Sequence, residues 1–122
     1  MDIKGMYELD KRFDKIEPDS CFISEITLAE LKYGIEKSQK KAQNQKALDN
    51  FLIGVTIVPI FHALDLYAQE KVRLQKAGIP IDDFDLLIGV TAVRNDLVMV
   101  TNNTNHFQRI KGISLEDWTI SA

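Results

Sequence analysis

The sequence predicts an α/β domain of three layers, in which helices cover both faces of a parallel sheet. Two observations lead to this prediction. Several short apolar runs show no polar alternation, which is typical of parallel strands buried on both faces. These runs alternate with longer segments that have helical periodicity. Because no linker, repeat or low-complexity segment interrupts the pattern, we expect a single domain over residues 1–122.

The first half of the chain is expected to hold three amphipathic helices and one short strand. The strand lies at residues 21–23, between the first helix and a second one that opens at Thr27. Gly54 closes the third helix. The apolar positions that define these helices are Met6, Leu9, Phe13 and Ile16 in the first, Leu28, Leu31 and Ile35 in the second, and Ala47, Leu48, Phe51 and Leu52 in the third.

The second half continues the alternation of strands and helices. Residues 55–60 form a β-branched strand with Pro59 near its end, and a helix follows that stops at Gly78. We expect Phe61, Leu64, Ala68 and Val72 to line that helix. The helix over residues 84–93 is apolar on almost every side and should be the most buried. Strands are expected at residues 97–100 and 113–115.

Composition and charge narrow the function classes. A hydrophobic content of 45% and a charged content of 27% are typical of a soluble globular protein. No apolar stretch reaches the roughly 20 residues of a membrane helix, and no signal region opens the chain, so we expect a cytoplasmic location and no membrane partner. A net charge of −3 argues against a non-specific nucleic-acid coat but not against a nuclease.

Polar side chains gather at three junctions where a strand gives way to a helix. The junctions lie at residues 23–31, 80–88 and 100–104. The carboxyl ends of parallel strands meet at one edge of a sheet, where the functional crevice of such folds lies. Carboxylates that converge there can form a pocket for a hard divalent cation.

Each of these residues also has a purely structural interpretation. Glu30 follows Thr27 by three residues and could complete a capping box, and Asp85 stands in the same relation to Asp82. At the third junction, Asn103 or Thr104 could cap a short helix that reaches Phe107, and His106 adds an imidazole.

Six other charged positions are interpreted as solvated surface. Asp65 and Glu70 are expected to be exposed helix charges. The same holds for a basic set that could alternatively line an RNA path, formed by Lys37, Lys40, Lys41 and Lys46.

Residues 23–38 resemble the second motif of VapC-type toxins, the PIN-domain ribonucleases of bacterial toxin–antitoxin pairs. Residues 78–89 resemble the third motif, and residues 100–107 with 112–113 and 116–118 resemble the C-terminal motif. The order and spacing of the motifs agree from about Lys4 to Trp118. The resemblance implies a PIN-like α/β/α fold with a parallel sheet.

The resemblance also implies an activity and its partners. Members of this family bind Mg²⁺ or Mn²⁺ with acidic side chains and cut RNA by metal-assisted phosphodiester hydrolysis. By their match to the motifs, Glu30 and Asp85 are expected to be catalytic residues that bind the metal ion. The fourth acidic position falls on Asn103 or His106, neither of them acidic, although Asn102 and Asn103 could orient water or substrate. The implied partners are RNA, a cognate antitoxin and a second copy of the toxin in a homodimer.

The start of the chain departs from the family pattern. The family begins with a central strand that ends in Leu-Asp-Thr-Asn, whose aspartate is a principal metal ligand, whereas residues 1–6 here resemble the segment after that strand. We therefore expect an N-terminally truncated PIN-like domain, and Asp2, Asp10 and Asp14 do not match the missing ligand. Two hypotheses follow: an endoribonuclease whose given sequence lacks its first strand, or a catalytically silent relative that binds an antitoxin or dimerises.

Overall fold

The computed structural model describes residues 22–101 and 103–117. Over these residues the chain forms four short strands, five α-helices and one short 3₁₀ helix. It divides into an N-terminal unit, Met1–Val58, and a C-terminal unit, Pro59–Ala122, and each unit is described by itself. The predicted alternation of helices with parallel strands is confirmed. A single continuous sheet in a single domain would involve both units, so it stays a prediction.

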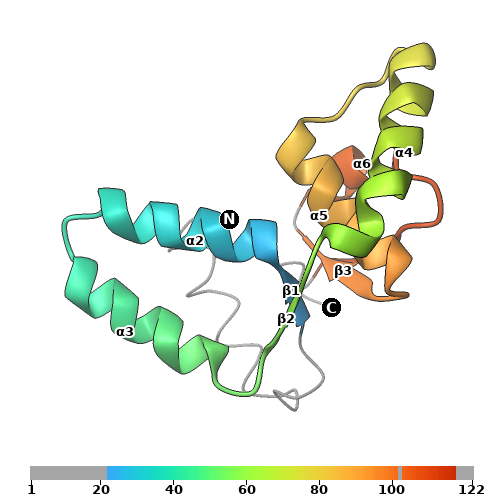
Figure 1. The fold of residues 1–122 in the computed structure, drawn as a ribbon. Helices are drawn as coiled ribbons and strands as arrows, with labels where there is room; N and C mark the ends of the chain where they lie inside the picture. The colour runs from blue at the N-terminus through green and yellow to red at the C-terminus, as the bar shows by residue number, and fades with distance from the viewer. Residues whose placement is uncertain (1–21, 102, 118–122) are drawn as a thin grey trace. The chain divides into compact units, whose positions relative to one another are not determined.

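In the N-terminal unit, two strands enclose a helical hairpin along the chain. β1 (Phe22–Ser24) pairs in parallel with β2 (Thr56–Val58). A parallel pair needs a long crossover connection, and here α2 (Glu25–Lys37) and α3 (Lys41–Leu52) provide it, lying side by side as a hairpin (Figure 1). The hairpin has a small core of its own, formed by Leu31, Ile35 and Leu48.

Two boundaries in this unit differ from the prediction. α2 begins at Glu25, ahead of Thr27, because the Ser24 hydroxyl accepts a hydrogen bond from the Thr27 amide at 3.1 Å and caps the helix there. β2 ends at Val58, short of the predicted residue 60, since Pro59 has no amide hydrogen for a strand ladder.

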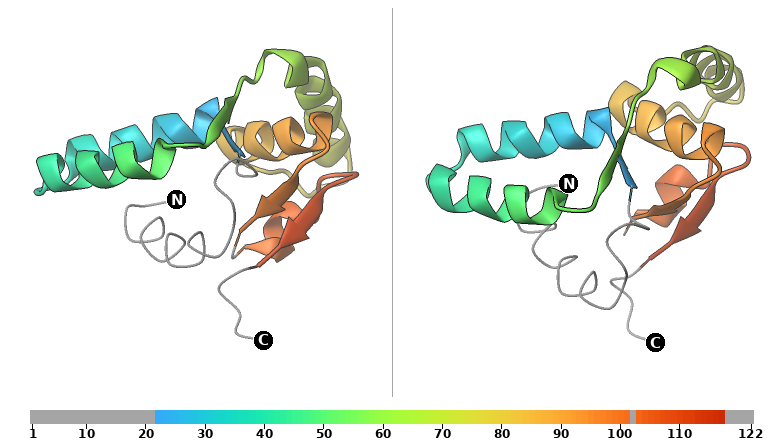
Figure 2. Two further views of the ribbon diagram at one scale, coloured as in Figure 1. Left: turned by 90° about the horizontal axis from the view of Figure 1, so that it is seen from below. Right: turned by 60° about the horizontal axis from the view of Figure 1, so that its bottom comes forward.

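The C-terminal unit contains η2 (Phe61–Ala63), α4 (Leu64–Lys76), α5 (Asp83–Arg94), β3 (Val98–Val100), α6 (Thr104–Phe107) and β4 (Ser114–Glu116). β3 and β4 pair in parallel, with Met99 opposite Leu115, and they lie side by side in Figure 2. Gly78 follows the end of α4 as predicted. Its φ of +75° is the left-handed conformation in which helices commonly terminate.

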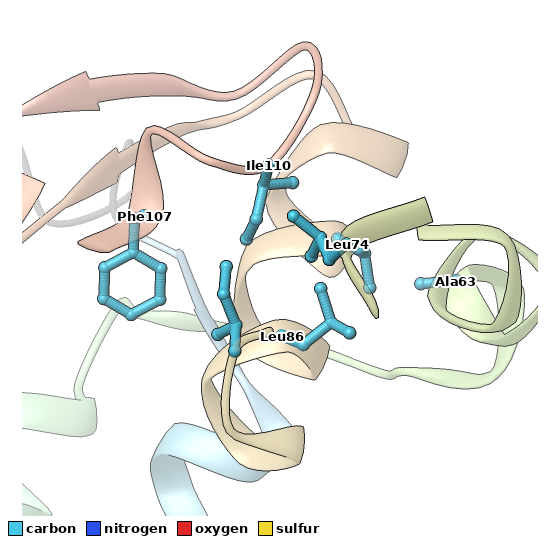
Figure 3. Close-up of a cluster of buried hydrophobic side chains, with 7 residues drawn as sticks. Ala63, Leu74, Leu86, Phe107 and Ile110 are labelled. Atoms are coloured by element: carbon cyan, nitrogen blue, oxygen red, sulfur yellow. The ribbon is translucent and has the colours of Figure 1, made fainter. Parts of the chain in front are cut away.

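The core of the C-terminal unit gathers around α5, which has more buried residues than any other described helix, as predicted. Figure 3 shows side chains from η2, α4, α5 and the segment after α6 meeting there. The buried members are Ala63, Leu74, Ile81, Leu86, Val90, Phe107 and Ile110. Elements far apart in sequence therefore share one apolar cluster, which fixes α4, α5 and α6 relative to one another.

The buried face of α4 is not the predicted one. Phe61, Leu64, Ala68 and Val72 are all exposed. The side chains that point inward from η2 and α4 are instead Ala63, Tyr67, Glu70 and Leu74, of which Tyr67 is half-buried. Their spacing of four, three and four residues is a regular helical stripe. The prediction failed because this stripe contains a carboxylate, which hydrophobic periodicity does not count as an inward position.

Glu70 was predicted to be a solvated charge, and this was wrong: only 5% of the residue is exposed. Its carboxylate accepts hydrogen bonds from Arg73 Nε at 2.6 Å and Nη2 at 2.8 Å, and from the Lys111 amide at 3.1 Å. The Arg73 hydrogen bonds hold the pKa of Glu70 below its ordinary value, with a smaller contribution from Lys111, although burial opposes them. A buried charge is tolerated when it is paired and hydrogen-bonded in this way.

Gly89 allows the segment after α6 to approach α5 closely. A Cβ atom at this position would overlap the Cδ1 atom of Ile110 and lie 3.8 Å from Cδ1 of Phe107. Ile110 is only 1% exposed, so its side chain has little room to move away. Helix propensity alone would favour alanine at this position. The close packing of Ile110 therefore explains why the residue is glycine.

Some predictions lie outside the described residues. The helix over residues 6–16, the position of Cys21 in the first strand and the expected loss of an earlier strand all concern the start of the chain, so they stay predictions. Among the described residues, no helix combines the length and apolar character that a membrane span requires.

We expect Gly89→Ala to lower the free energy of unfolding, because overpacking of about 1–3 kcal/mol outweighs a helix-propensity gain of about 1 kcal/mol. Ile110→Val removes the Cδ1 atom that the new methyl group would meet. The double variant should therefore be more stable than the sum of the two single changes, by about 1 kcal/mol in urea unfolding. Strict additivity would contradict the described contact.

We expect Glu70→Gln to destabilise the protein by about 1–3 kcal/mol near neutral pH and by less in acid. The folded-state pKa of Glu70 is depressed, so its stabilising contribution is present above its ordinary pKa near 4.5 and is lost as the pH falls through the folded value. Urea unfolding at about pH 7 and about pH 3 measures this. The control is Glu36→Gln, which removes an exposed pair with Lys41 and should change stability little at either pH. A Glu70→Gln effect independent of pH would contradict the assignment.

Candidate functional site

Glu30 lies in the second turn of α2 and is partly buried. The capping interpretation of this residue was wrong, because Ser24 caps the helix and Thr27 already lies in its first turn. Among the described residues, no hydrogen bond or ion pair engages the Glu30 carboxylate. The Glu30 side chain therefore does not cap α2, the structural role that its sequence position allowed.

The basic set on the helical hairpin is a solvated face, as predicted. All four side chains are exposed, namely those of Lys37, Lys40, Lys41 and Lys46. Lys41 pairs with Glu36 at 3.1 Å, and the ammonium of Lys37 lies 5.4 Å from the centre of the Tyr33 ring.

Three carboxylates occur at the start of α5, and each has a different partner. Asp82 is the N-cap, and its carboxylate accepts a hydrogen bond from the Phe84 amide at 3.2 Å. Asp83 accepts a hydrogen bond from the Tyr67 hydroxyl at 2.8 Å and pairs with Lys71 at 2.9 Å. The Lys71 contact, followed by that of Tyr67, lowers the pKa of Asp83. Two of the three carboxylates thus fix where α5 begins.

The third carboxylate, Asp85, faces the segment after β3. Its Oδ2 atom lies 3.2 Å from Nε2 of His106, and 36% of the Asp85 side chain is exposed. Asp82 is the N-cap, as the capping box in the sequence predicts, but among the described residues the Asp85 carboxylate bonds His106 and not the Asp82 amide. The contact joins the second and third junctions, whose convergence the sequence predicted. The predicted strand before the second junction was wrong, because α5 follows α4 with no strand in residues 77–82.

α6 fixes the position of His106 through local contacts. Phe107 is buried in the core, and the imidazole packs edge-on against its ring at a centroid distance of 5.1 Å. The Asn103 carbonyl accepts hydrogen bonds from the His106 and Phe107 amides at 3.2 and 3.3 Å. Asn103 is the N-cap residue, as one interpretation predicted, but its side chain makes no capping bond and is exposed. Asn102 lies outside the described residues.

The structure therefore brings Asp85 together with His106. His106 lies on α6, three residues after the N-cap Asn103 and directly before the buried Phe107. Glu30 lies in the N-terminal unit, so its approach to Asp85 stays a prediction. The sequence identified His106 only as an imidazole of open role. The hydrogen-bond partners of Asp83 on α4 were missed, although Tyr67 and Lys71 lie four residues apart on one helical face.

The donor atoms in the C-terminal unit fit only part of a divalent-cation site. Nowhere in the described residues do three or more histidine, cysteine, aspartate or glutamate side chains converge on one point. A Mg²⁺ ion, however, is usually held by one or two carboxylates and completed by water and substrate phosphate. The half-exposed Asp85 carboxylate fits that open type of site, and Asp82 and Asp83 do not add to it because other groups occupy them.

Comparisons with known proteins identify the family. The PIN domain family matches residues 4–113. Ribonuclease VapC2 of Rickettsia felis is 42% identical over 97 residues, which cover 79% of this chain and 72% of that protein. The tRNA(fMet)-specific endonuclease VapC of Shigella flexneri is 34% identical over 110 residues, covering 89% and 83% of the two chains.

A solved structure agrees with these sequence relatives. The DNA-bound VapBC of Salmonella typhimurium matches with a TM-score of 0.82 at 34% identity, and the match covers 90% of this chain and 83% of that one. A family match over most of the chain, two relatives above 30% identity and a shared fold agree with the three motifs found in the sequence. The chain belongs to the PIN-domain family, as a VapC-type ribonuclease toxin of VapBC toxin–antitoxin systems.

Proposed function

We propose that this chain cuts RNA by metal-assisted phosphodiester hydrolysis, with Asp85 as its principal acidic residue. The observation that supports the proposal is the division of roles at the start of α5. Asp82 and Asp83 are occupied by the helix cap and by α4, whereas Asp85 is half-exposed and faces an imidazole from another element. A partly exposed carboxylate that neither caps the helix nor pairs with α4 can bind a metal ion.

Asp85 and Glu30 would hold a Mg²⁺ or Mn²⁺ ion, with Asp85 as the ligand in the C-terminal unit. Such an ion supplies charge stabilisation for the phosphate and a hydroxide nucleophile at neutral pH. Glu30 is assigned as the second carboxylate because it matches the second motif and has no capping role.

Other residues of the site act on orientation and on the substrate. His106 contacts Oδ2 of Asp85, which restrains how the carboxylate turns. The exposed side-chain amide of Asn103, at the start of α6, can donate a hydrogen bond to a phosphate oxygen of RNA. Contacts of this kind fix the register and orientation of a nucleic acid on a protein. The proposed role for Asn103 is therefore substrate orientation.

The partners proposed for this chain follow from its relatives. Solved structures similar to it are VapBC complexes, two of them bound to DNA. We infer that this chain pairs with a VapB-type antitoxin and that it forms a homodimer, as the family resemblance implies. The proposed substrate is RNA, since the relatives are named as ribonucleases and as a tRNA(fMet)-specific endonuclease.

We expect Asp85→Asn to lower the RNA-cleavage rate of the purified full-length chain by on the order of 10²-fold or more, because a charged group at the reacting phosphate is lost. Asp83→Asn is a matched control, the same change two residues earlier in the helix, where the carboxylate serves Lys71 and Tyr67. It should retain most of the activity. Equal losses in both variants would contradict the role of Asp85. A wild-type chain without cleavage in Mg²⁺ or Mn²⁺ would favour a catalytically silent relative that binds an antitoxin or dimerises.

We also expect the full-length chain to bind Mn²⁺ in isothermal titration calorimetry without RNA. Asp85→Asn should weaken this binding by about 10-fold or more, since one of few carboxylate ligands is removed. Asp83→Asn should bind Mn²⁺ as the wild type does. Unchanged binding in Asp85→Asn would show that the ion is held elsewhere, whatever the activity of the chain.

A further inference from the structure

The segment from His106 to Gly112 follows one face of α5. His106 lies against Asp85, and Ile110 with Phe107 lies against Gly89. Gly112 lies against Val93, since a Cβ at Gly112 would be 3.6 Å from Val93 Cγ1. The three contact points on α5 are four residues apart, so they belong to one helical face. The position of His106 at Asp85 is therefore one end of a continuous contact.

The opposite side of this segment is held by α4. Glu70 accepts a hydrogen bond from the Lys111 amide at 3.1 Å, and Arg73 Nη2 donates to the Arg109 carbonyl at 2.7 Å. These bonds lie on either side of Ile110, the residue that packs against Gly89. Within the described part of the chain, the backbone-to-backbone bonds of this segment are short-range, such as that from the Ile110 amide to the Phe107 carbonyl at 3.0 Å.

Glu70 and Arg73 act as one charged unit in this contact. Two hydrogen bonds join them, and Arg73 reaches the Arg109 carbonyl with the same Nη2 atom that bonds Glu70 Oε2. Charge-assisted bonds of this kind are roughly twice as strong as neutral ones. Only 7% of the Glu70 side chain is exposed, so water competes little for the hydrogen bonds that Glu70 accepts, whereas the bond from Arg73 to the Arg109 carbonyl lies at the surface. A further long-range bond of the segment, from Arg109 Nη1 to the Pro80 carbonyl at 3.2 Å, also lies at the surface.

We propose that Glu70 is a positioning residue, which, with Arg73, holds residues 109–111 against α5 and thereby places His106 at Asp85. Its value for RNA cleavage rests on the proposed function, but its effect on the His106–Asp85 contact does not. The contacts of Glu70 are with Arg73 and Lys111, so it acts through the backbone and not on the substrate.

The test is a nuclear magnetic resonance measurement on the full-length chain at one fixed pH near neutrality. The sequence contains two histidines, so the His106 ring signal is followed with His62, on η2, as an internal reference. Asp85→Asn should displace the His106 signal in the wild-type background. In the Glu70→Gln background the displacement should fall to about half or less, because the ring is no longer held at residue 85. In the control background, Glu36→Gln, it should keep its full size.

Arg73→Lys is the second variant, for the case that Glu70→Gln does not fold. It keeps a positive charge beside Glu70 and leaves the Lys111 bond intact, but it removes the guanidinium that reaches the Arg109 carbonyl. The displacement of the His106 signal should be reduced here as well. A full displacement in every folded variant of Glu70 or Arg73 would overturn the proposal.

RNA cleavage supplies a second measurement. Glu70→Gln or Arg73→Lys should lower kcat by about 10-fold or more and leave KM within about 2-fold, since positioning is lost without loss of a substrate contact. If these variants instead lower kcat/KM by raising KM, with kcat unchanged, the positioning role would be overturned. If the wild-type chain does not cleave RNA, the proposed function fails, and the His106 signal still decides whether Glu70 positions the contact.

Discussion

The close approach of Ile110 to Gly89 is the contact on which the rest of the C-terminal unit depends. It lets the segment after α6 lie directly on α5, so that Phe107 and Ile110 join the same core as Leu86. A larger residue at position 89 would push this segment outward. Since His106 belongs to that segment, the same apolar contact also sets the distance between its imidazole and Asp85.

Charged groups complete what the apolar contact begins. α4 bonds the start of α5 through Lys71 and Tyr67, and it bonds residues 109–111 through Glu70 and Arg73. Both segments that meet at the candidate site are thus held from one helix. The surface pair at Asp83 contributes little free energy by itself, as exposed pairs do, whereas the buried carboxylate of Glu70 has no solvent alternative to its partners.

Much of the fold could be predicted from the sequence, because the local signals there are strong. The order of helices and strands from β1 to β4, the stop at Gly78 and the buried character of α5 follow from apolar periodicity and from glycine and proline positions. The face of α4 could not be predicted, since its inward stripe contains Glu70, whose partners lie three and 41 residues away. Pairing across such distances leaves no periodic signal.

The candidate site was predictable in part. Its motifs identified Glu30, Asp85 and Asn103, and the junctions of Asp85 and His106 meet as predicted. The predicted reason, that both junctions follow strands, holds only for His106, because α5 follows a helix. The capping box predicts Asp82 as the N-cap of α5, as observed, but the different partners of Asp83 and Asp85 were not predictable, because the two side chains are chemically alike. Their roles are separated by partners from other elements, namely Lys71, Tyr67 and His106.

A nuclear Overhauser spectrum of the folded chain tests the contact between Ile110 and Gly89 most directly. We expect cross-peaks between the δ1 methyl of Ile110 and the α protons of Gly89, and between the ring of His106 and the β protons of Asp85. Both must be present in the folded wild-type protein. A folded chain that lacks the Ile110–Gly89 cross-peak would contradict the contact on which the placement of the site depends.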